Sequence, residues 1–326
     1  MDRNQVVFRI DAADVSAIRF GVSPGYELCW AVRVLLNPAA HPLQWGWLRQ
    51  VRDRVPRAAF GLLSTVIGPK GYFPDFLTTS PTWDVTPTDE IDRIRVAPPD
   101  VIRKDLAKMV DRSRGRRQVV LSALRDDPTS TRGRLADAWE QLWDTVVAPY
   151  WDQLQRLLRA DIAFRVRRTA ASGLAATIDS LHDRVSWHDD AIVVAMLYYS
   201  EVLDCAGDGV VLVPSVLGPT CSVLTEKPVH PTLFYPAVGI TETWIAHRDT
   251  ALAALTRLMG DGRARTLLCL DAARSTTEVA KECDLAISTA SHHLGVLRAA
   301  ALITSRRTGH QVLHSRTPLG DTLAGN

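Results

Sequence analysis

The segment STTEVAKECDLAISTASHHLGVLRAAALITSRR (residues 275–307), continued by TGHQVLHSR (308–316), carries the clearest structural signals in this 326-residue chain. Its first residue, Ser275, stands three positions before Glu278, and this S-x-x-E pattern predicts a capping box at the start of a helix. Asp284 follows where the chain must turn, and Asp adopts the left-handed conformation of a tight turn more readily than most residues do. The segment therefore predicts a short helix followed by a tight turn.

A second helix is predicted after the turn, with Ser288 as its N-cap. Its outward face is polar near the start and small further along. A helix in the major groove of DNA needs such a face, because bulky side chains would hold the backbone away from the base edges. The predicted buried stripe comprises Ala290, Leu294, Leu297 and Ala301. The predicted outward face comprises Ser288, Thr289, His292, Gly295 and Ala299, with Ser291 and His293 on its flanks.

Two alternating segments, 302–307 and 311–316, predict a two-stranded wing with a turn at Thr308-Gly309. Basic residues gather at the tip of this wing, where they could meet phosphates or the minor groove; such contacts fix register but carry little sequence information. Helix, turn, helix and wing together give the order of a winged helix-turn-helix motif.

The charge of the segment favours DNA binding over the plainer alternative of a solvated surface helix. Between Ser288 and Arg316 the chain has four arginines, four histidines and no acidic residue, whereas a merely solvated segment would mix both signs. The residues expected to contact double-stranded DNA are Thr277, Ser288, Thr289, Ser291, His292, His293, Arg306, Arg307 and His310.

These residues also resemble the ArsR family of bacterial transcriptional regulators. The family's recognition-helix pattern, SxHLxxLxxAGL, is matched by residues 291–302, with Ala301 in place of the usual Gly. The segment MGDGRARTLLCL (259–270) corresponds to the helix that enters the motif, and the chain as a whole is similar to large actinobacterial members with an N-terminal domain of uncharacterised function and a TPLG tail, here Thr317–Gly320. The resemblance implies a cytoplasmic regulator, most simply a repressor, that reads a palindromic operator as a homodimer.

Both metal sites that are usual in that family lack a counterpart here, so we expect neither a metal nor a cofactor. Arsenic-sensing members carry a C-x-C pair where this chain has Ser275-Thr276-Thr277, and hydroxyls do not replace thiolates for a soft metal. Zinc-sensing members use a long helix after the wing, for which few residues remain. The five cysteines form no C-x-C or C-x-x-C pair and are expected to be buried apolar residues: Cys29, Cys205, Cys221, Cys269 and Cys283.

The expected fold class is α+β and mainly helical, with an N-terminal domain over residues 1–240 and the winged helix-turn-helix over 241–326. Apolar stripes predict helices over 132–148 and from Pro149 to about Leu181. After this helix the chain contains short runs rich in β-branched residues, which predict a small antiparallel sheet: 191–197, 210–213, 221–224 and 232–235. Residues 68–100, rich in Pro, Gly, Thr and Asp, predict an excursion with little regular structure that its aromatic side chains (Tyr72, Phe73, Phe76 and Trp83) pin to the core.

The N-terminal domain carries no strong enzyme signature, so we expect no catalytic activity. His188-Asp189-Asp190 could suggest a metal site but reads better as a polar turn, and neither G-x-S-x-G nor H-E-x-x-H occurs. No leader peptide and no membrane span are expected, which favours the cytoplasm. Three hypotheses remain: a regulator controlled by a small-molecule effector bound near residues 191–199 or 210–217, a constitutive architectural DNA-binding protein, or an enzyme fused to a DNA-binding module.

Overall fold

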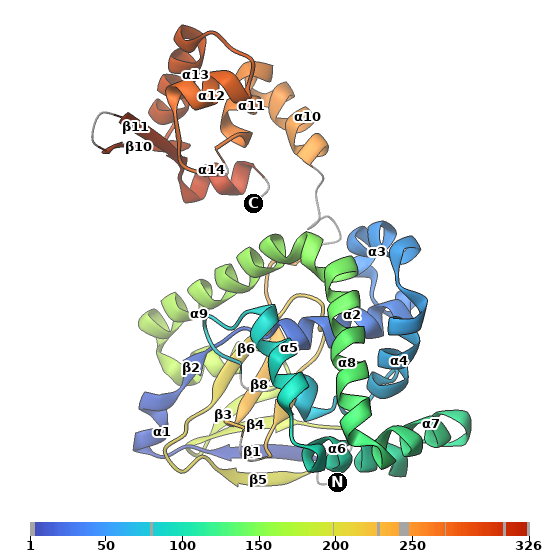
Figure 1. Ribbon diagram of the computed structural model, residues 1–326. Helices are drawn as coiled ribbons and strands as arrows, with labels where there is room; N and C mark the ends of the chain where they lie inside the picture. The colour runs from blue at the N-terminus through green and yellow to red at the C-terminus, as the bar shows by residue number, and fades with distance from the viewer. Residues whose placement is uncertain are drawn as a thin grey trace. The chain divides into compact units, whose positions relative to one another are not determined.

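The computed structural model describes residues 4–78, 81–197, 199–226, 229–240, 248–270, 272–308 and 311–324. The chain divides into two compact units, residues 1–242 and 243–326, and each has a hydrophobic core of its own (Figure 1). The boundary that the sequence predicts between residues 240 and 241 falls beside residues 241–247, which lie outside the described residues. The fold class, α+β and mainly helical, is confirmed.

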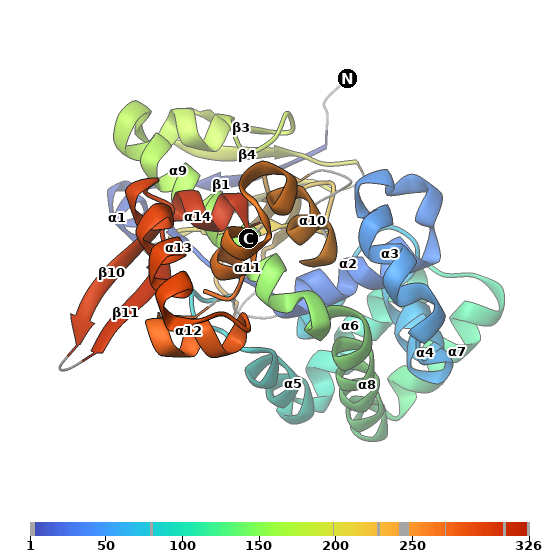
Figure 2. The same ribbon diagram turned by 90° about the horizontal axis from the view of Figure 1, so that it is seen from above.

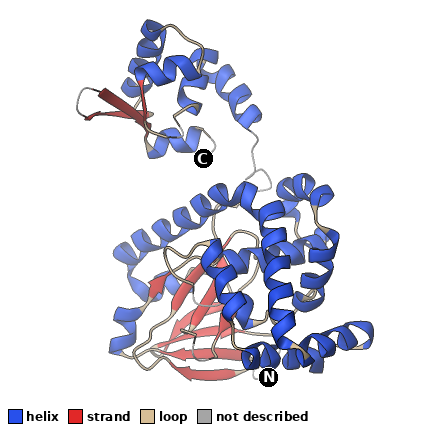
Figure 3. Cartoon of the chain, in the orientation of Figure 1, coloured by secondary structure: helices blue, strands red, loops and turns tan. Residues whose placement is uncertain are grey.

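Helices make up most of the N-terminal unit (Figure 3). Several begin at local signals: Ser23 accepts a hydrogen bond from the backbone of Tyr26 at the start of the second helix, and Pro24 occupies its first position. A single glycine, Gly173 with φ of 85°, breaks the longest helix. The helices are α1 (Ala12–Ala17), α2 (Pro24–Leu36), α3 (Trp45–Val51), α4 (Arg57–Ile67), α5 (Pro87–Val96), α6 (Pro99–Asp111), α7 (Gly115–Asp126), α8 (Pro128–Leu142) and α9 (Trp151–Asp179).

The strands of this unit form two four-stranded sheets of mixed direction, which corrects the expectation of one small antiparallel sheet. The sheet orders are β3-β4-β1-β5 and β2-β6-β8-β7, and the pairs β1/β5, β2/β6 and β6/β8 are parallel. The expectation was wrong for two reasons: two strands from the start of the chain join the later ones, and β6 pairs in parallel with β8 instead of with β7, the next strand in sequence. The strands are β1 (Gln5–Arg9), β2 (Arg19–Phe20), β3 (Val185–His188), β4 (Ala191–Ala195), β5 (Glu201–Asp204), β6 (Val211–Ser215), β7 (Ser222–Leu224) and β8 (Thr232–Pro236).

One core cluster joins the two sheets, since Val6 and Phe8 of β1 belong to the same buried cluster as Leu212 of β6. On the second sheet, the ring of Phe234 in β8 stacks on Tyr26 of α2 with ring centroids 3.8 Å apart. These contacts bury alternate residues on both faces of that sheet, so β6 and β8 are almost wholly apolar in sequence and almost wholly buried.

The segment 68–100 is more regular than its composition suggests. Thr86 and Asp89 form a reciprocal capping box and Pro87 takes the first helical position, so α5 occupies much of the stretch. Phe73 and Phe76 are buried as expected, whereas Trp83 is 51% exposed and does not anchor the segment in the core. The T-x-x-D capping signal was present in the sequence and would have predicted this helix.

The His188-Asp189-Asp190 turn connects β3 to β4 as a hairpin. Asp189 and Asp190 have φ of 48° and 54°, the pair of left-handed residues that a two-residue hairpin turn requires. His188 is exposed, and its Nε2 lies 3.2 Å from its neighbour's carboxylate. The segment is thus a polar turn, as expected, and it joins two strands.

The C-terminal unit is a set of short helices with a three-stranded sheet in the order β10-β11-β9. Figures 1 and 2 both show the β10–β11 hairpin projecting from the helices of this unit. Among the described helices of the whole chain, none combines the length and the apolarity that crossing a membrane requires. The elements are α10 (Arg248–Met259), α11 (Asp261–Leu268), β9 (Arg274–Ser275), α12 (Thr276–Glu282), α13 (Ile287–Ala299), β10 (Ile303–Thr308), β11 (Gln311–Arg316) and α14 (Pro318–Leu323).

Candidate nucleic-acid interface

The turn between α12 and α13 sets the direction in which the second helix leaves the first. Ser275 and Glu278 form the predicted capping box at the start of α12. At its end, Asp284 adopts φ of 53°, and the N–H of Leu285 donates to the carbonyl oxygen of Ala280 over 2.8 Å. This is the Schellman closure of a helix, with Asp at the position that Gly usually holds. The tight turn predicted at Asp284 is confirmed.

Helix α13 begins two residues earlier than predicted. Its N-cap is Ala286, whose carbonyl oxygen accepts from the N–H of Ala290 over 2.9 Å, so Ser288 is the second residue of the helix and does not cap it. The physical reason is the preceding turn: Leu285 is drawn against the core of the unit, which leaves Ala286 extended and starts the helix at Ile287.

Helix α13 buries one side and exposes the other, as the spacing predicts. Ala290, Leu294 and Leu297 lie in the core, but Ala301 is exposed, because it follows the helix with φ of 57° instead of continuing it. Opposite the buried stripe, four side chains are exposed: Ser288, Ser291, His292 and Ala299. Thr289 is half-buried beside them.

Gly295 lies on this exposed side of α13 and is not required by packing inside the chain. A Cβ built at this position would meet no described atom within 4 Å. Glycine in the middle of a helix lowers its stability by about 0.5–1 kcal/mol relative to Ala, so its presence here has no reason within the unit. A surface against which another molecule approaches closely would supply one.

His293 is set apart from the other predicted contact residues. Its ring faces Gly262 of α11, where an added Cβ would come within 2.5 Å of Nε2. Its Nδ1 is buried without a hydrogen-bond partner among the described residues, and burial, followed by the charges of His292 and Arg263, holds the pKa of His293 below its ordinary value. The structure thus places His293 between two helices, and its contact with DNA stays a prediction.

The wing forms as predicted from β10 and β11, in antiparallel register with Ser305 opposite His314. Arg306 and Arg307 are exposed, and as neighbours in a strand they point to opposite faces of the hairpin. His310 lies outside the described residues. Thr277, also predicted to contact DNA, is exposed as the second residue of α12.

Two members of the basic segment point into the unit instead of outward. Arg316 donates from Nη1 to the carbonyl oxygens of Leu267 and Leu268 at the end of α11, and from Nε to Asp321 over 2.8 Å. His314 is 7% exposed. Both lie on the inward side of the hairpin, and the two-residue alternation from buried Ile303 could have predicted this. The third strand, β9, was not predicted from the sequence.

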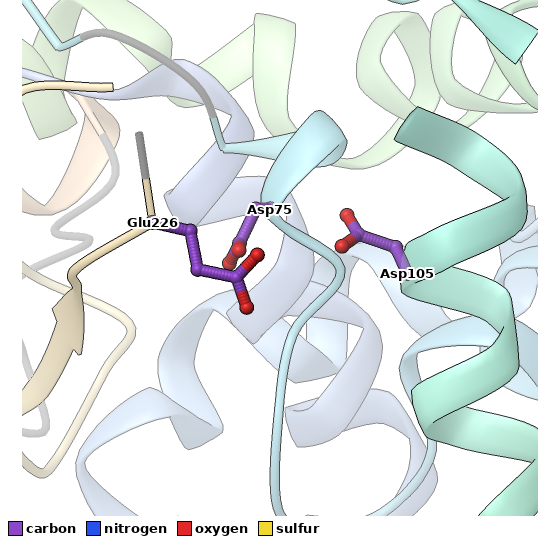
Figure 4. Close-up of side chains that lie close together, drawn as sticks. All are labelled: Asp75, Asp105 and Glu226. Atoms are coloured by element: carbon purple, nitrogen blue, oxygen red, sulfur yellow. The ribbon is translucent and has the colours of Figure 1, made fainter. Parts of the chain in front are cut away.

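A group of carboxylates in the N-terminal unit lies close enough together to bind a cation. In the structure, the ammonium group of a lysine is that cation. The nearest carboxylate oxygens of Asp75, Asp105 and Glu226 all lie within 4.8 Å of one another (Figure 4). The Nζ atom of Lys108 lies 3.3 Å from Asp105 and 3.9 Å from Asp75, and it donates a hydrogen bond to Glu226. Lys104 pairs with Glu226 over 2.7 Å. The lysine ammonium groups thus supply the charge that a metal would bring.

The electrostatics of this group fit a structural cluster. Burial, then the charge of Asp105, raises the pKa of Asp75 to about 7. For Glu226, burial also raises the pKa, but hydrogen bonds from Lys104 and Lys108 outweigh it and bring the pKa below its ordinary value. His188 is not part of this cluster. The cluster could not be predicted from sequence spacing, because its members are 30 and 121 residues apart.

Two family matches agree with this geometry. Residues 263–306 match the family described as "Helix-turn-helix domain", which is of the ArsR type, and residues 85–241 match a family of unknown function (DUF5937). No curated protein and no solved structure matches the chain. The chain therefore carries a helix-turn-helix domain that matches an ArsR-type family, behind an N-terminal part that matches a family of unknown function, in agreement with the predicted architecture.

Proposed function

We propose that the protein is a transcriptional repressor that binds a palindromic operator as a homodimer and responds to a small molecule. The observation that carries the DNA-binding part is the exposed side of α13, which combines small and polar side chains with Gly295 in open space. Arg306 and Arg307 of the wing supply exposed positive charge in the same unit. The net charge of the chain is only +2, so this local patch must provide the attraction to phosphates.

The homodimer part of the proposal rests on the N-terminal unit. Helix α8 and the turn after it cannot supply the interface, because their apolar stripe is buried within the unit: Leu135, Ala138, Trp139, Leu142, Val146 and Val147. Helix α9 keeps two exposed apolar side chains, Phe164 (41%) and Val166 (50%). A recognition helix that reads a palindrome needs a two-fold partner about 34 Å away, and α9 is the element that we assign to this contact.

We propose that the effector is a small molecule and not a metal ion. All five cysteines lie in described parts of the chain, and each is buried. Residues 210–217, one of the two regions expected to lie near an effector, are buried throughout, so an effector would have to bind elsewhere on the sheet or open it. We propose that the protein has no catalytic activity and acts where the chromosome lies, in the cytoplasm.

The decisive experiment is a selection of DNA duplexes from a randomised 30-base-pair pool with the full-length chain. We expect enrichment of a palindrome whose half-sites are one helical turn apart, and an affinity that falls steeply with salt. A Phe164→Asp variant tests the dimer by light scattering, with Val15→Asp, an exposed position on α1, as the control. Failure to enrich any sequence would overturn the repressor proposal, and an unchanged dimer in Phe164→Asp would exclude α9 as the interface.

A further inference from the structure

His314 joins the wing to the first helix of the helix-turn-helix motif. Its Nδ1 lies 2.8 Å from the hydroxyl of Ser305, its register partner on β10, and its Nε2 lies 3.1 Å from the hydroxyl of Thr276, the first residue of α12. The ring is 7% exposed. One side chain thus bridges both strands of the wing and the start of a helix.

The chemistry of the imidazole suits this bridge. Neutral histidine has one donor and one acceptor nitrogen, and each hydroxyl can either donate or accept, so both bonds can form in either tautomer. Burial and then the charge of Arg298 lower the pKa of His314, so the neutral form prevails at pH 7. Two neutral hydrogen bonds of this kind fix the angle of the ring without placing a buried charge.

The bridge is placed where it can control how the wing meets a ligand. Arg306, an exposed wing arginine, directly follows Ser305 in β10. On the other side, Thr276 directly follows Ser275, which caps α12 and pairs with Leu313 of β11. Movement of the wing relative to the helices must therefore break at least one of the two hydrogen bonds of His314.

We propose that His314 is a positioning residue that holds the wing at the angle at which Arg306 reaches a DNA phosphate while α13 lies in the major groove. This inference rests on the proposed DNA binding. It assigns a role to a buried side chain that touches no DNA itself. The role is specific: His314 should matter for contacts made by the wing and not for contacts made by α13.

A double-mutant cycle on the full-length chain tests this role, with the best duplex from the randomised pool as the probe. Arg306→Ala should weaken binding about fivefold in the wild-type background, because one phosphate contact is lost. In a His314→Leu background, Arg306→Ala should lower the affinity for the duplex by less than about twofold, since the wing is no longer held in place. His292→Ala should cost the same factor in both backgrounds. Thr304→Ala, an exposed neighbour in β10, serves as the matched control.

Conservative variants separate positioning from folding. His314→Gln can keep the hydrogen bond to Thr276, and His314→Asn can keep the hydrogen bond to Ser305. Each variant should therefore restore part of the affinity that His314→Leu loses, and in each the change Arg306→Ala should again weaken binding. If His314→Leu fails to fold, these two variants carry the same cycle. Additive effects of His314 and Arg306 in every pair would overturn the positioning role. Absence of binding by the wild-type chain would instead overturn the proposed function.

Discussion

The N–H of Leu302 donates to the carbonyl oxygen of Leu297 over 2.9 Å and so closes the end of α13. Ala301 lies within this closure at φ of 57°, the position that glycine usually holds. The same arrangement ends α12, with Asp284 at φ of 53°. Both helices of the motif therefore end at a non-glycine residue with a left-handed backbone conformation. This conformation costs an L-residue about 1–2 kcal/mol.

Replacing Ala301 by Gly should stabilise the C-terminal unit by about 1 kcal/mol, because the left-handed strain is removed and only part of the gain is offset by the freer unfolded chain. The measurement is urea unfolding followed by circular dichroism. Ala299→Gly is the matched control: it lies in the helix itself and should destabilise the unit by up to about 1 kcal/mol. A loss of stability in Ala301→Gly would contradict the strain argument.

Replacing Gly295 by Ala should separate stability from DNA binding. The new methyl group meets no described atom within 4 Å, so the unit should gain about 0.5–1 kcal/mol from helix propensity. Affinity for the selected duplex should fall, because the methyl group stands between the helix and the groove. Gly262→Ala provides the contrast: its Cβ would meet the ring of His293, so it should lower stability. Equal affinity of Gly295→Ala and wild type for the duplex would show that this face of α13 does not approach DNA closely.

Replacing His292 by Ala should cost about 1–3 kcal/mol at one position of each half-site and relax base preference there, because His292 is an exposed member of the reading face. Replacing Arg306 by Ala should instead weaken all sequences similarly and reduce the salt slope by about one. Titration of single-base variants of the duplex distinguishes the two patterns. An unchanged specificity profile for His292→Ala would show that another surface reads the bases.

Local signals predicted the parts of this fold that depend on neighbours in sequence. The predicted Ser275–Glu278 capping box was correct to the residue, since a cap is satisfied within four residues. The direction of the strands was not predictable, because β1 pairs with residues more than 180 positions away. His314 was counted with the surface charges because its partners, Ser305 and Thr276, lie on other elements.

Zinc, cadmium and arsenite should leave the complex with DNA intact. Cys283, the cysteine of the helix-turn-helix motif, is buried at the end of α12, and the hydroxyl of Thr276 is engaged by His314. Cys283 cannot offer its thiolate without local unfolding, and the hydroxyl of Thr276 is not a soft ligand. Fluorescence anisotropy of a labelled duplex during metal titration is the measurement. Release at one metal per chain, abolished by Cys283→Ser, would refute this expectation.

The N-terminal unit should lose stability as the pH rises from about 5 to 7 or 8, where the loss levels off. Burial raises the pKa of Glu27 to about 7 and that of Glu90 to about 8, despite hydrogen bonds to both carboxylates. The folded unit therefore holds protons that the unfolded chain has already released above pH 5, and each group contributes a slope of up to about 1.4 kcal/mol per pH unit.

Tryptophan fluorescence in urea at pH 5.5 and 8.5 measures this slope, since eight of the nine tryptophans precede residue 242. Glu90→Gln keeps an oxygen that can accept from the N–H of Gly25 and an NH2 group that can donate to the hydroxyl of Ser23, but it removes the titration. The variant should match wild type at pH 5.5 and exceed its stability at pH 8.5. Histidines with lowered pKa act in the opposite direction, so the comparison with Glu90→Gln isolates the glutamate. Parallel pH profiles of the two proteins would contradict the assignment.

The position of β1 in its sheet has a consequence for synthesis on the ribosome. The strand ends at Arg9, yet its neighbours β4 and β5 span residues 191–204. At about 5–20 residues per second, roughly 10–40 s pass before both neighbours exist. During that interval Val6 and Phe8, fully buried in the finished unit, have no sheet to join, and both edges of the strand are open to other nascent chains. Co-translational protection of the first ten residues, for example by a chaperone, should therefore govern the yield of folded protein.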